Sequence, residues 1–207
     1  QAEDGIRDLV RSRGLGDVYK RQLLILDEIQ CGFGRTGKLW AFEHYNIQPD
    51  ILLAAKGMGG GMPIGCFISS KEIMHSLREN PVLGHITTFG GHPVSTAASL
   101  ATLETLLEEN LIDQVEKKAL LFKSLLKHPS IKEIRNKGLL MGVEFESYEF
   151  LKKIIDRSLE VGIITDWFLF CNNSMRIAPP LTISEIEIRE VCHKLLESIE
   201  WASKKNN

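Results

Sequence analysis

Two short apolar runs that each end in a charged residue constrain the fold of this chain most. Leu23–Leu26 is followed at once by Asp27, and the run ILLAA at 51–55 is followed at once by Lys56. Each run has the length and composition of a buried strand in a parallel sheet. Because open α/β sheets bind ligands at the carboxyl ends of their strands, we predict that Asp27 and Lys56 lie at one functional edge of such a sheet.

A G-x-G-x-x-G pattern follows the first run and raises the alternative of a dinucleotide site. Its glycines are Gly32, Gly34 and Gly37. A dinucleotide-binding loop starts at the strand end and opens a helix. Here Asp27 and Glu28 occupy the place where a pyrophosphate would approach, and their charges would repel it. We therefore reject a nicotinamide or flavin site and interpret Glu28 and Arg35 as structural residues.

A strand-end acid and a strand-end lysine allow two interpretations. Buried lysines are rare, and desolvation lowers the pKa of the amine so that it can form a Schiff base. Such a pair, with the glycine-rich loop at 57–61, suits pyridoxal phosphate, whose aldehyde takes a lysine, whose ring nitrogen takes an acid and whose phosphate takes backbone N–H donors. The alternative is an ordinary Asp–Lys ion pair at a sheet edge. The residues alone leave both interpretations open.

Composition excludes several classes of function. The net charge of −2 does not indicate nucleic acid or an anionic membrane as a partner, and no apolar run approaches the roughly 20 residues of a membrane helix. A hydrophobic fraction of 43% is sufficient for a real core. The cysteines have no metal-ligand spacing; they are Cys31, Cys66, Cys171 and Cys192. We therefore expect free thiols, no metal site and a cytoplasmic protein.

The periodicity of the chain changes after Pro129. Before it we predict strands at 23–26, 51–55 and 64–70, a helix at 71–80, and a long helical pattern from Val94 to about Lys127 with a break at Asn110. After it we predict strands at 139–145, 163–165 and 175–181, a helix at 150–162 closed by Gly162, and a terminal helix at 182–205 with Ser184 as N-cap. We place the domain boundary between residues 115 and 116.

Three stretches of the chain read, in order, LLILDEIQCGFGRTGKLWAFEHYNIQPDILLAAKGMGGGMPIG, TTFGGHPVSTAASLATLE and MRIAPPLTISEIEI. Together they resemble the class III aminotransferases of ornithine, acetylornithine and ω-amino acid type, and the resemblance covers residues 23–207. It implies an α/β fold, the pyridoxal-phosphate-dependent transferase fold type I. Residues 23–115 would be the C-terminal part of the large, cofactor-binding domain with a mixed, mostly parallel sheet, and residues 116–207 a small α+β domain.

The resemblance also implies a role for individual residues. Asp27 is similar to the acid that keeps the pyridinium nitrogen protonated, and Gln30 to the residue that contacts the cofactor's 3′ oxygen. Lys56 resembles the Schiff-base lysine that also moves the substrate proton. Thr88 resembles the hydroxyl that binds the cofactor phosphate of the neighbouring subunit, which implies a homodimer. Arg176 is similar to the arginine that holds a substrate carboxylate bidentately.

The implied reaction is transfer of an amino group from an amino acid or ω-amino acid, of which ornithine and N-acetylornithine are favoured, to a 2-oxo acid. Aminomutases and decarboxylating enzymes share Asp27 and Lys56 and remain alternatives, as does an inactive module. We expect residues 1–22 to be foreign to the protein and the rest to correspond to the C-terminal half of such an enzyme. Because half a sheet leaves strand edges uncovered, we expect poor solubility and weak activity.

Overall fold

The computed structural model describes residues 22–205 of the chain, which divide into two compact units. The first contains the residues up to Phe33 together with Lys38–Glu109, and the second contains Gly34–Gly37 together with Asn110 onwards. These compact units divide after Glu109, and the 34–37 segment belongs with the second unit. The large and small domains with a boundary between residues 115 and 116 stay a prediction. We expected residues 1–22 to be foreign to the protein. Of these, residues 1–21 lie outside the part that the structure describes.

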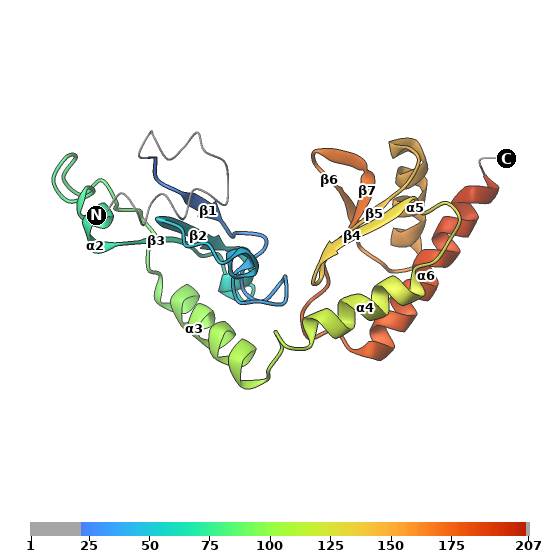
Figure 1. Cartoon of the computed structure of the whole chain (residues 1–207), viewed down its shortest axis with the longest axis horizontal. Coiled ribbons are helices and arrows are strands. Elements are labelled where there is room, and N and C mark those ends of the chain that lie inside the picture. The colour runs from blue at the N-terminus through green and yellow to red at the C-terminus, as the bar shows by residue number, and fades with distance from the viewer. Residues whose placement is uncertain (1–21, 206–207) are drawn as a thin grey trace. The chain divides into compact units, whose positions relative to one another are not determined.

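The first unit is built on a three-stranded mixed sheet with the order β1-β2-β3 (Figure 1). β1 (Ile25–Asp27) runs parallel to β2 (Ile51–Ala55), and β3 (Gly65–Ser69) runs antiparallel to β2. Its helical elements are η2 (Ala41–Tyr45), η3 (Lys56–Gly59), α2 (Lys71–His75) and α3 (Pro93–Glu108). The strands expected near 23–26, 51–55 and 64–70 are thus confirmed, each to within two residues.

The helix predicted at 71–80 is shorter than expected. α2 begins after Ser70, whose side chain accepts a hydrogen bond from the amide of Ile73, and it ends at His75. The amides of Ser76, Leu77 and Arg78 then bond to carbonyls three residues back, so the chain continues as turns. Pro81 lies just beyond and disfavours helical geometry in the residue before it.

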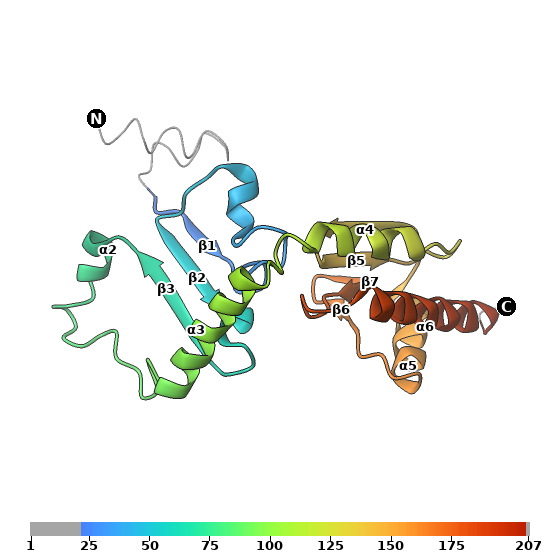
Figure 2. The same cartoon turned by 90° about the horizontal axis from the view of Figure 1, so that it is seen from below.

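The second unit is an antiparallel sheet with helices packed on one side (Figures 1 and 2). The strand order is β4-β5-β7-β6, and the elements are β4 (Glu133–Lys137), β5 (Leu140–Glu144), β6 (Asp166–Phe168), β7 (Cys171–Ile177), α4 (Val115–Leu125), α5 (Tyr148–Glu160) and α6 (Glu185–Lys204). Alternation along the strands sets the two faces. Met141, Val143 and Met175 are buried in the core, whereas Gly142 and Arg176 lie on the opposite face.

Several boundaries in the second half follow from local signals. The helical pattern breaks at Asn110, which has a φ of 51°, and Gly162 has a φ of 86° just after α5. Ser184 caps α6, and Glu187 completes a capping box. Three strand expectations were wrong. The strand predicted at 163–165 lies at 166–168, and the one predicted at 175–181 lies at 171–177. β4 was missed because an edge strand reading EIRNK contains a single apolar residue.

Burial differs between the two units. Most of the buried apolar side chains belong to the second unit, and Val115, Phe122, Leu151 and Ile188 are fully enclosed there. On the first sheet, Ile25, Phe67 and Ile68 are between 44% and 53% exposed, and Leu23 just before β1 is 54% exposed. The first sheet therefore carries apolar side chains that the described residues leave partly exposed. None of the helices described is long and apolar enough to cross a membrane.

Candidate functional site

Asp27 and Lys56 lie at the carboxyl ends of two neighbouring parallel strands. Asp27 is the last residue of β1 and stands opposite Leu53 of β2, and Lys56 directly follows β2. The amide of Glu28 continues the ladder by donating to the carbonyl of Leu53 at 3.0 Å. Sheet register therefore brings the backbones of the acid and the lysine to the same edge, where open α/β sheets bind ligands.

Both strand-end side chains are exposed, and so is Gln30. The expectation that Lys56 is a buried lysine is therefore wrong for this structure. Gly57, Gly60 and Gly61 have no side chains to cover the amine, and a Cβ placed on Gly61 would meet no atom within 4 Å. Burial thus does not set Lys56 apart from other lysines of the chain. Its position at the strand end and its backbone conformation do.

The backbone of Lys56 is in a conformation that lysine rarely adopts. Its φ is 49°, in the left-handed region, and it starts the single turn of η3. The turn is held against α3, because a Cβ on Gly60 would lie 2.2 Å from Oγ1 of Thr102. Strained residues of this kind persist where the surrounding structure enforces them, and they are concentrated at active sites and ligand clamps.

The two adjacent acids at the end of β1 have opposite environments. Asp27 is exposed, and its Oδ1 accepts a hydrogen bond from the amide of Ile29 at 2.9 Å. Glu28 is only 3% exposed, and its carboxylate accepts from the amides of Ala41 and Phe42, both at 2.9 Å, at the start of η2. Glu28 is therefore structural, as predicted, and Asp27 is the acid that a ligand can reach.

The thiol of Cys31 also points to the buried acid. Its Sγ donates to Oε2 of Glu28 at 3.0 Å. Burial, together with this hydrogen bond and the negative charge of Glu28, raises the pKa of Cys31 to about 12. A thiol held in this protonated state is a poor nucleophile, so Cys31 is not a candidate for covalent chemistry.

The glycine pattern does not form a dinucleotide loop. Gly34 and Gly37 have φ values of 84° and 87°, and the chain continues through turns instead of opening a helix. Arg35 donates from Nη1 to the carbonyl oxygens of Leu139 and Pro179, and its own carbonyl accepts from the amide of Leu139 at 3.0 Å. The glycines thus allow the 34–37 segment to place Arg35 in hydrogen-bonding contact with the rest of the second unit. Arg35 is therefore structural, as predicted.

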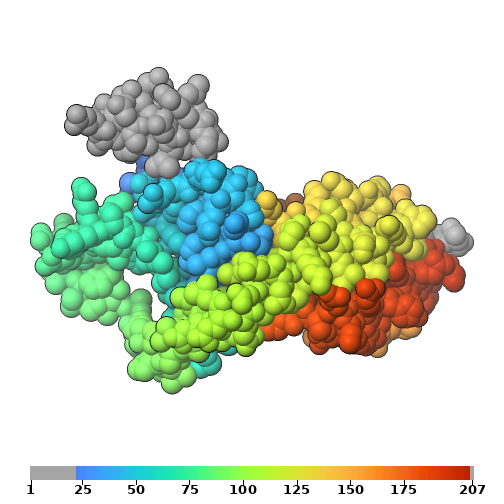
Figure 3. Space-filling model, turned by 60° about the horizontal axis from the view of Figure 1, so that its bottom comes forward, coloured from blue at the N-terminus to red at the C-terminus, as the bar shows by residue number. Residues whose placement is uncertain are grey.

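Thr88 lies in an exposed loop ahead of α3. All residues from 78 to 94 are exposed, and Phe89 beside Thr88 is 78% exposed. Figure 3 shows this loop bordering an open gap on the visible face of the first unit. The loop ends at His92, which is the N-cap of α3, and Pro93 takes the first helical position. Thr88 is thus accessible to a ligand or to another chain.

Arg176 belongs to the second unit, whereas the other four predicted site residues belong to the first. It stands opposite Asp166 in the β6–β7 ladder, and its guanidinium forms two hydrogen bonds to that carboxylate, Nε to Oδ1 at 2.8 Å and Nη2 to Oδ2. Sequence reasoning missed Asp166, because the strand that contains it was placed three residues too early. The register of β6 against β7 was the signal that it lacked.

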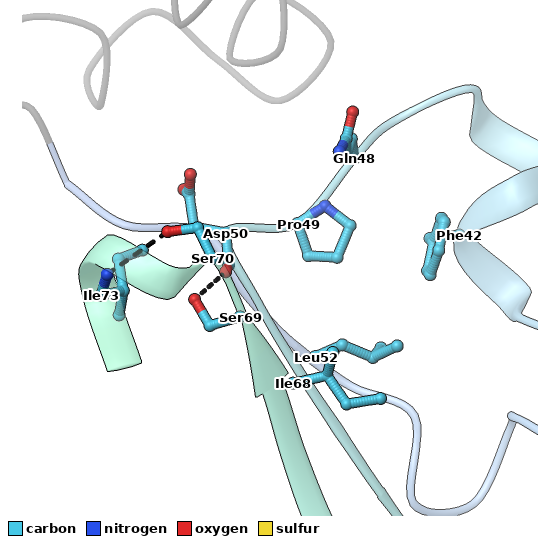
Figure 4. A pocket seen from close by; sticks show the side chains of 9 residues that line it. All are labelled: Phe42, Gln48, Pro49, Asp50, Leu52, Ile68, Ser69, Ser70 and Ile73. Carbon is cyan, nitrogen blue, oxygen red and sulfur yellow. Dashed lines mark hydrogen bonds between the residues drawn. The ribbon is translucent and has the colours of Figure 1, made fainter. Parts of the chain in front are cut away.

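A cavity of about 410 Å³ lies at the other end of the first sheet (Figure 4). Its lining includes Asp50, which precedes β2, and Ser69 and Ser70, which end β3. These three polar side chains already form hydrogen bonds within the protein. The Asp50 carboxylate accepts from the amide of Leu24 at 2.7 Å, Ser69 donates to the carbonyl of Asp50 at 2.6 Å, and Ser70 caps α2. No predicted site residue lines this cavity, so the strand-end edge remains the candidate site.

Comparison with known proteins finds aminotransferases, both by family and by structure. The family described as aminotransferase class-III matches residues 15–199. An ornithine aminotransferase from Toxoplasma gondii, whose crystals show partial occupancy of PLP at the active site, is 34% identical over 91% of this chain and 45% of that chain, with a TM-score of 0.81. A Bacillus anthracis aminotransferase is 33% identical over 89% of this chain and 46% of that chain, with a TM-score of 0.81.

A thermostable omega transaminase from Pseudomonas jessenii, a six-fold mutant, is 28% identical over 90% of this chain and 46% of that chain, with a TM-score of 0.80. This chain therefore spans about half the length of the structures that it matches. The family match begins at residue 15, within the segment that we expected to be foreign.

Proposed function

The chain belongs to the class-III aminotransferase family, whose members are PLP-dependent transaminases, and from this premise we propose that it carries the Schiff-base lysine, the ring-nitrogen acid and the substrate arginine of such an enzyme. The proposed reaction moves an amino group from an amino acid or ω-amino acid to a 2-oxo acid. Ornithine and related ω-amino acids are the favoured donors, because an arginine that binds a carboxylate selects substrates that have one.

The chemistry of the residues at the strand ends fits pyridoxal phosphate. An exposed amine at Lys56 is available to an aldehyde, and an exposed carboxylate at Asp27 is available to a pyridinium nitrogen. The carboxylate of the adjacent Glu28 already accepts hydrogen bonds from two backbone amides, which leaves Asp27 as the partner for the ring nitrogen. Gln30 is proposed to contact the cofactor's 3′ oxygen, and it too is exposed at this edge.

Each proposed residue has a distinct role. When bound, pyridoxal phosphate supplies an electron sink for the bonding pair released at the substrate carbon. Asp27 keeps a proton on the ring nitrogen by placing a negative charge beside it. Lys56 holds the cofactor before the substrate arrives and then carries the proton away from the substrate carbon as a general base. Arg176 orients the substrate by its carboxylate.

Thr88 extends the proposal to a homodimer. In this proposal its hydroxyl donates to the cofactor phosphate of a second copy of the chain, and the exposure of the loop that contains it supports such a contact. A cytoplasmic location remains our prediction from the unpaired cysteines, and all four of them are free in the structure.

The observation that carries the proposal is the register of β1 and β2, which brings Asp27 and Lys56 to one sheet edge. The test is to incubate the full chain with pyridoxal phosphate, reduce it with borohydride and locate the adduct by mass spectrometry. We expect the adduct on Lys56 and its loss in Lys56→Ala. The exposed lysine that starts α2 gives a matched control, since Lys71→Ala should retain the adduct.

An adduct that survives Lys56→Ala, or one spread over surface lysines, would contradict the assignment. Asp27→Asn separates binding from catalysis: we expect the adduct to persist while transamination falls by about 100-fold or more. A requirement for a 2-oxo acid distinguishes transamination from other reactions of the same cofactor, because an aminomutase forms product without it.

A further inference from the structure

We infer that Asp166 is a positioning residue that holds Arg176 with one edge of its guanidinium presented to a ligand carboxylate. The inference rests on the proposed role of Arg176 and adds a specific partner to it. Asp166 and Arg176 are directly opposite each other on adjacent antiparallel strands, so their side chains share the sheet face away from the helical core.

The contact uses one defined edge of the guanidinium. Asp166 accepts from Nε and Nη2 of Arg176, which is the side-on edge of a planar group with five N–H donors. The second edge, formed by Nη1 and Nη2, has the same spacing and matches another carboxylate. In the described part of the chain, Nη1 takes part in no hydrogen bond.

The backbone and the neighbouring strand support this arrangement. Thr165 donates from Oγ1 to the carbonyl of Arg176 at 2.7 Å, which ties β6 to β7 beside the pair. On the other side, the residue opposite Arg176 in β5 is Gly142, and a Cβ placed there would lie 3.2 Å from the ring of Phe168 and 3.0 Å from Oγ of Ser174. Arg176 is thus held on β7 by Asp166 of the neighbouring strand, with Nη1 left for a ligand.

Two opposing effects decide how Asp166 influences a ligand. The carboxylate repels an anionic ligand, but the side chains of the pair are 36% and 47% exposed, so solvent and salt screen this repulsion. Against this, an arginine that is already fixed in one rotamer has less conformational freedom to lose on binding. Orientation does not depend on ionic strength, and we expect it to dominate at high salt.

The experiment measures glutarate binding to the full chain by NMR at low and at high salt. Glutarate is a dicarboxylate without a reactive carbonyl, so it reports carboxylate recognition without catalysis. For Arg176→Lys we expect glutarate affinity to fall about ten-fold, and for Asp166→Asn about three-fold at high salt. A control on the same sheet face is Glu133→Gln, which removes a partner of Arg135 on β4 and should leave affinity unchanged.

The side-chain Nε–H resonance of Arg176 provides a second readout that a purely structural role would not change. If Asp166 stays on the side-on edge while glutarate takes the other, this resonance keeps its hydrogen-bonded position at saturating glutarate and loses it in Asp166→Asn. Thermal unfolding of each variant checks that the second unit remains folded.

The outcomes distinguish failure of the proposed role of Arg176 from failure of the proposed role of Asp166. If the unmodified chain does not bind glutarate, or if Arg176→Lys has no effect, the proposed role of Arg176 fails, and with it the inference. If Arg176→Lys weakens binding but Asp166→Asn leaves it equal or tighter at high salt, or if glutarate displaces Asp166 from Nε, the inference fails while the role of Arg176 stands.

Discussion

Single residues at the end of β1 show how neighbouring groups of the same type acquire different tasks. Asp27 and Glu28 are adjacent carboxylates, yet one is exposed and the other is buried at the start of η2. Burying a carboxylate is costly unless hydrogen bonds compensate it, and Glu28 accepts from two amides and one thiol. The backbone that presents Asp27 is thus fixed by the residue next to it.

Cys31 provides a pH test of this local arrangement. Its pKa is raised from 9.0 to about 12, first by burial and then by Glu28. Because the folded state retains the proton longer than the unfolded state, this group stabilises the fold below pH 9 and its contribution is lost as pH rises from 9 towards 12. In the native chain, peptide-resolved alkylation of Cys31 should therefore stay slow up to pH values well above 9.

Glu28→Gln is the matched variant for this measurement. It removes the negative charge but retains an amide oxygen, so the pKa of Cys31 should move part of the way back while the effect of burial remains. An alkylation profile of native Cys31 that matches the urea-unfolded chain would contradict the burial of this thiol.

At the scale of elements, the 34–37 segment is part of the second unit although its sequence neighbours belong to the first. Gly138, in the turn between β4 and β5, has a φ of 53°, and a Cβ there would lie 2.6 Å from the carbonyl carbon of Thr36 and 2.8 Å from the carbonyl oxygen of Arg35. The turn and the segment are therefore in close backbone contact.

Gly138→Ala should consequently be strongly destabilising. It adds the strain of a left-handed alanine to a clash with backbone atoms that cannot rotate away, and we expect a loss of about 2–4 kcal/mol in the free energy of unfolding. Gly162→Ala is the control, since Gly162 has a φ of 86° but open space around its Cβ position. That variant should lose about 1 kcal/mol in urea unfolding, from strain alone.

Equal losses for the two variants would show that the 34–37 segment does not pack against the turn. A clearly larger loss for Gly138→Ala than for Gly162→Ala would support the close backbone contact between the turn and the 34–37 segment.

At the scale of the whole molecule, the two units differ in how much apolar surface they bury. The second has a continuous core that includes Phe122, Phe145 and Leu195, whereas the first has Ile47, Leu52, Ala54 and Leu106 as its buried apolar residues among those described. Because burial of apolar surface is the main favourable term in folding, the first unit should be the less stable.

Hydrogen exchange measures this difference directly. We expect amides of β1, β2 and β3 to exchange much faster than amides of β5, α5 and α6, and urea unfolding to show two transitions, the first from the sheet with Lys56. Pyridoxal phosphate should slow exchange in the first unit only, since a ligand stabilises the state that binds it. A single cooperative transition with uniform protection would contradict this division.

The sequence alone determined those parts of the fold that depend on local chemistry. Apolar runs of strand length, a glycine after a helix, and a serine with a glutamate three residues later predict β2, the end of α5 and the start of α6 without knowledge of any distant residue. The same reasoning identified Asp27 and Lys56 as strand-end residues, because a charge directly after an apolar run is a local feature.

Tertiary structure alone decided what depends on distant partners. The exposure of Lys56 follows from what surrounds a sheet edge, and the burial of Glu28 follows from amides thirteen and fourteen residues away. The pairing of Asp166 with Arg176 requires a strand register, and the seating of Arg35 requires a carbonyl 144 residues further along the chain. Sequence patterns specify local conformation, but they do not specify which distant groups meet, because those contacts form only when the whole unit packs.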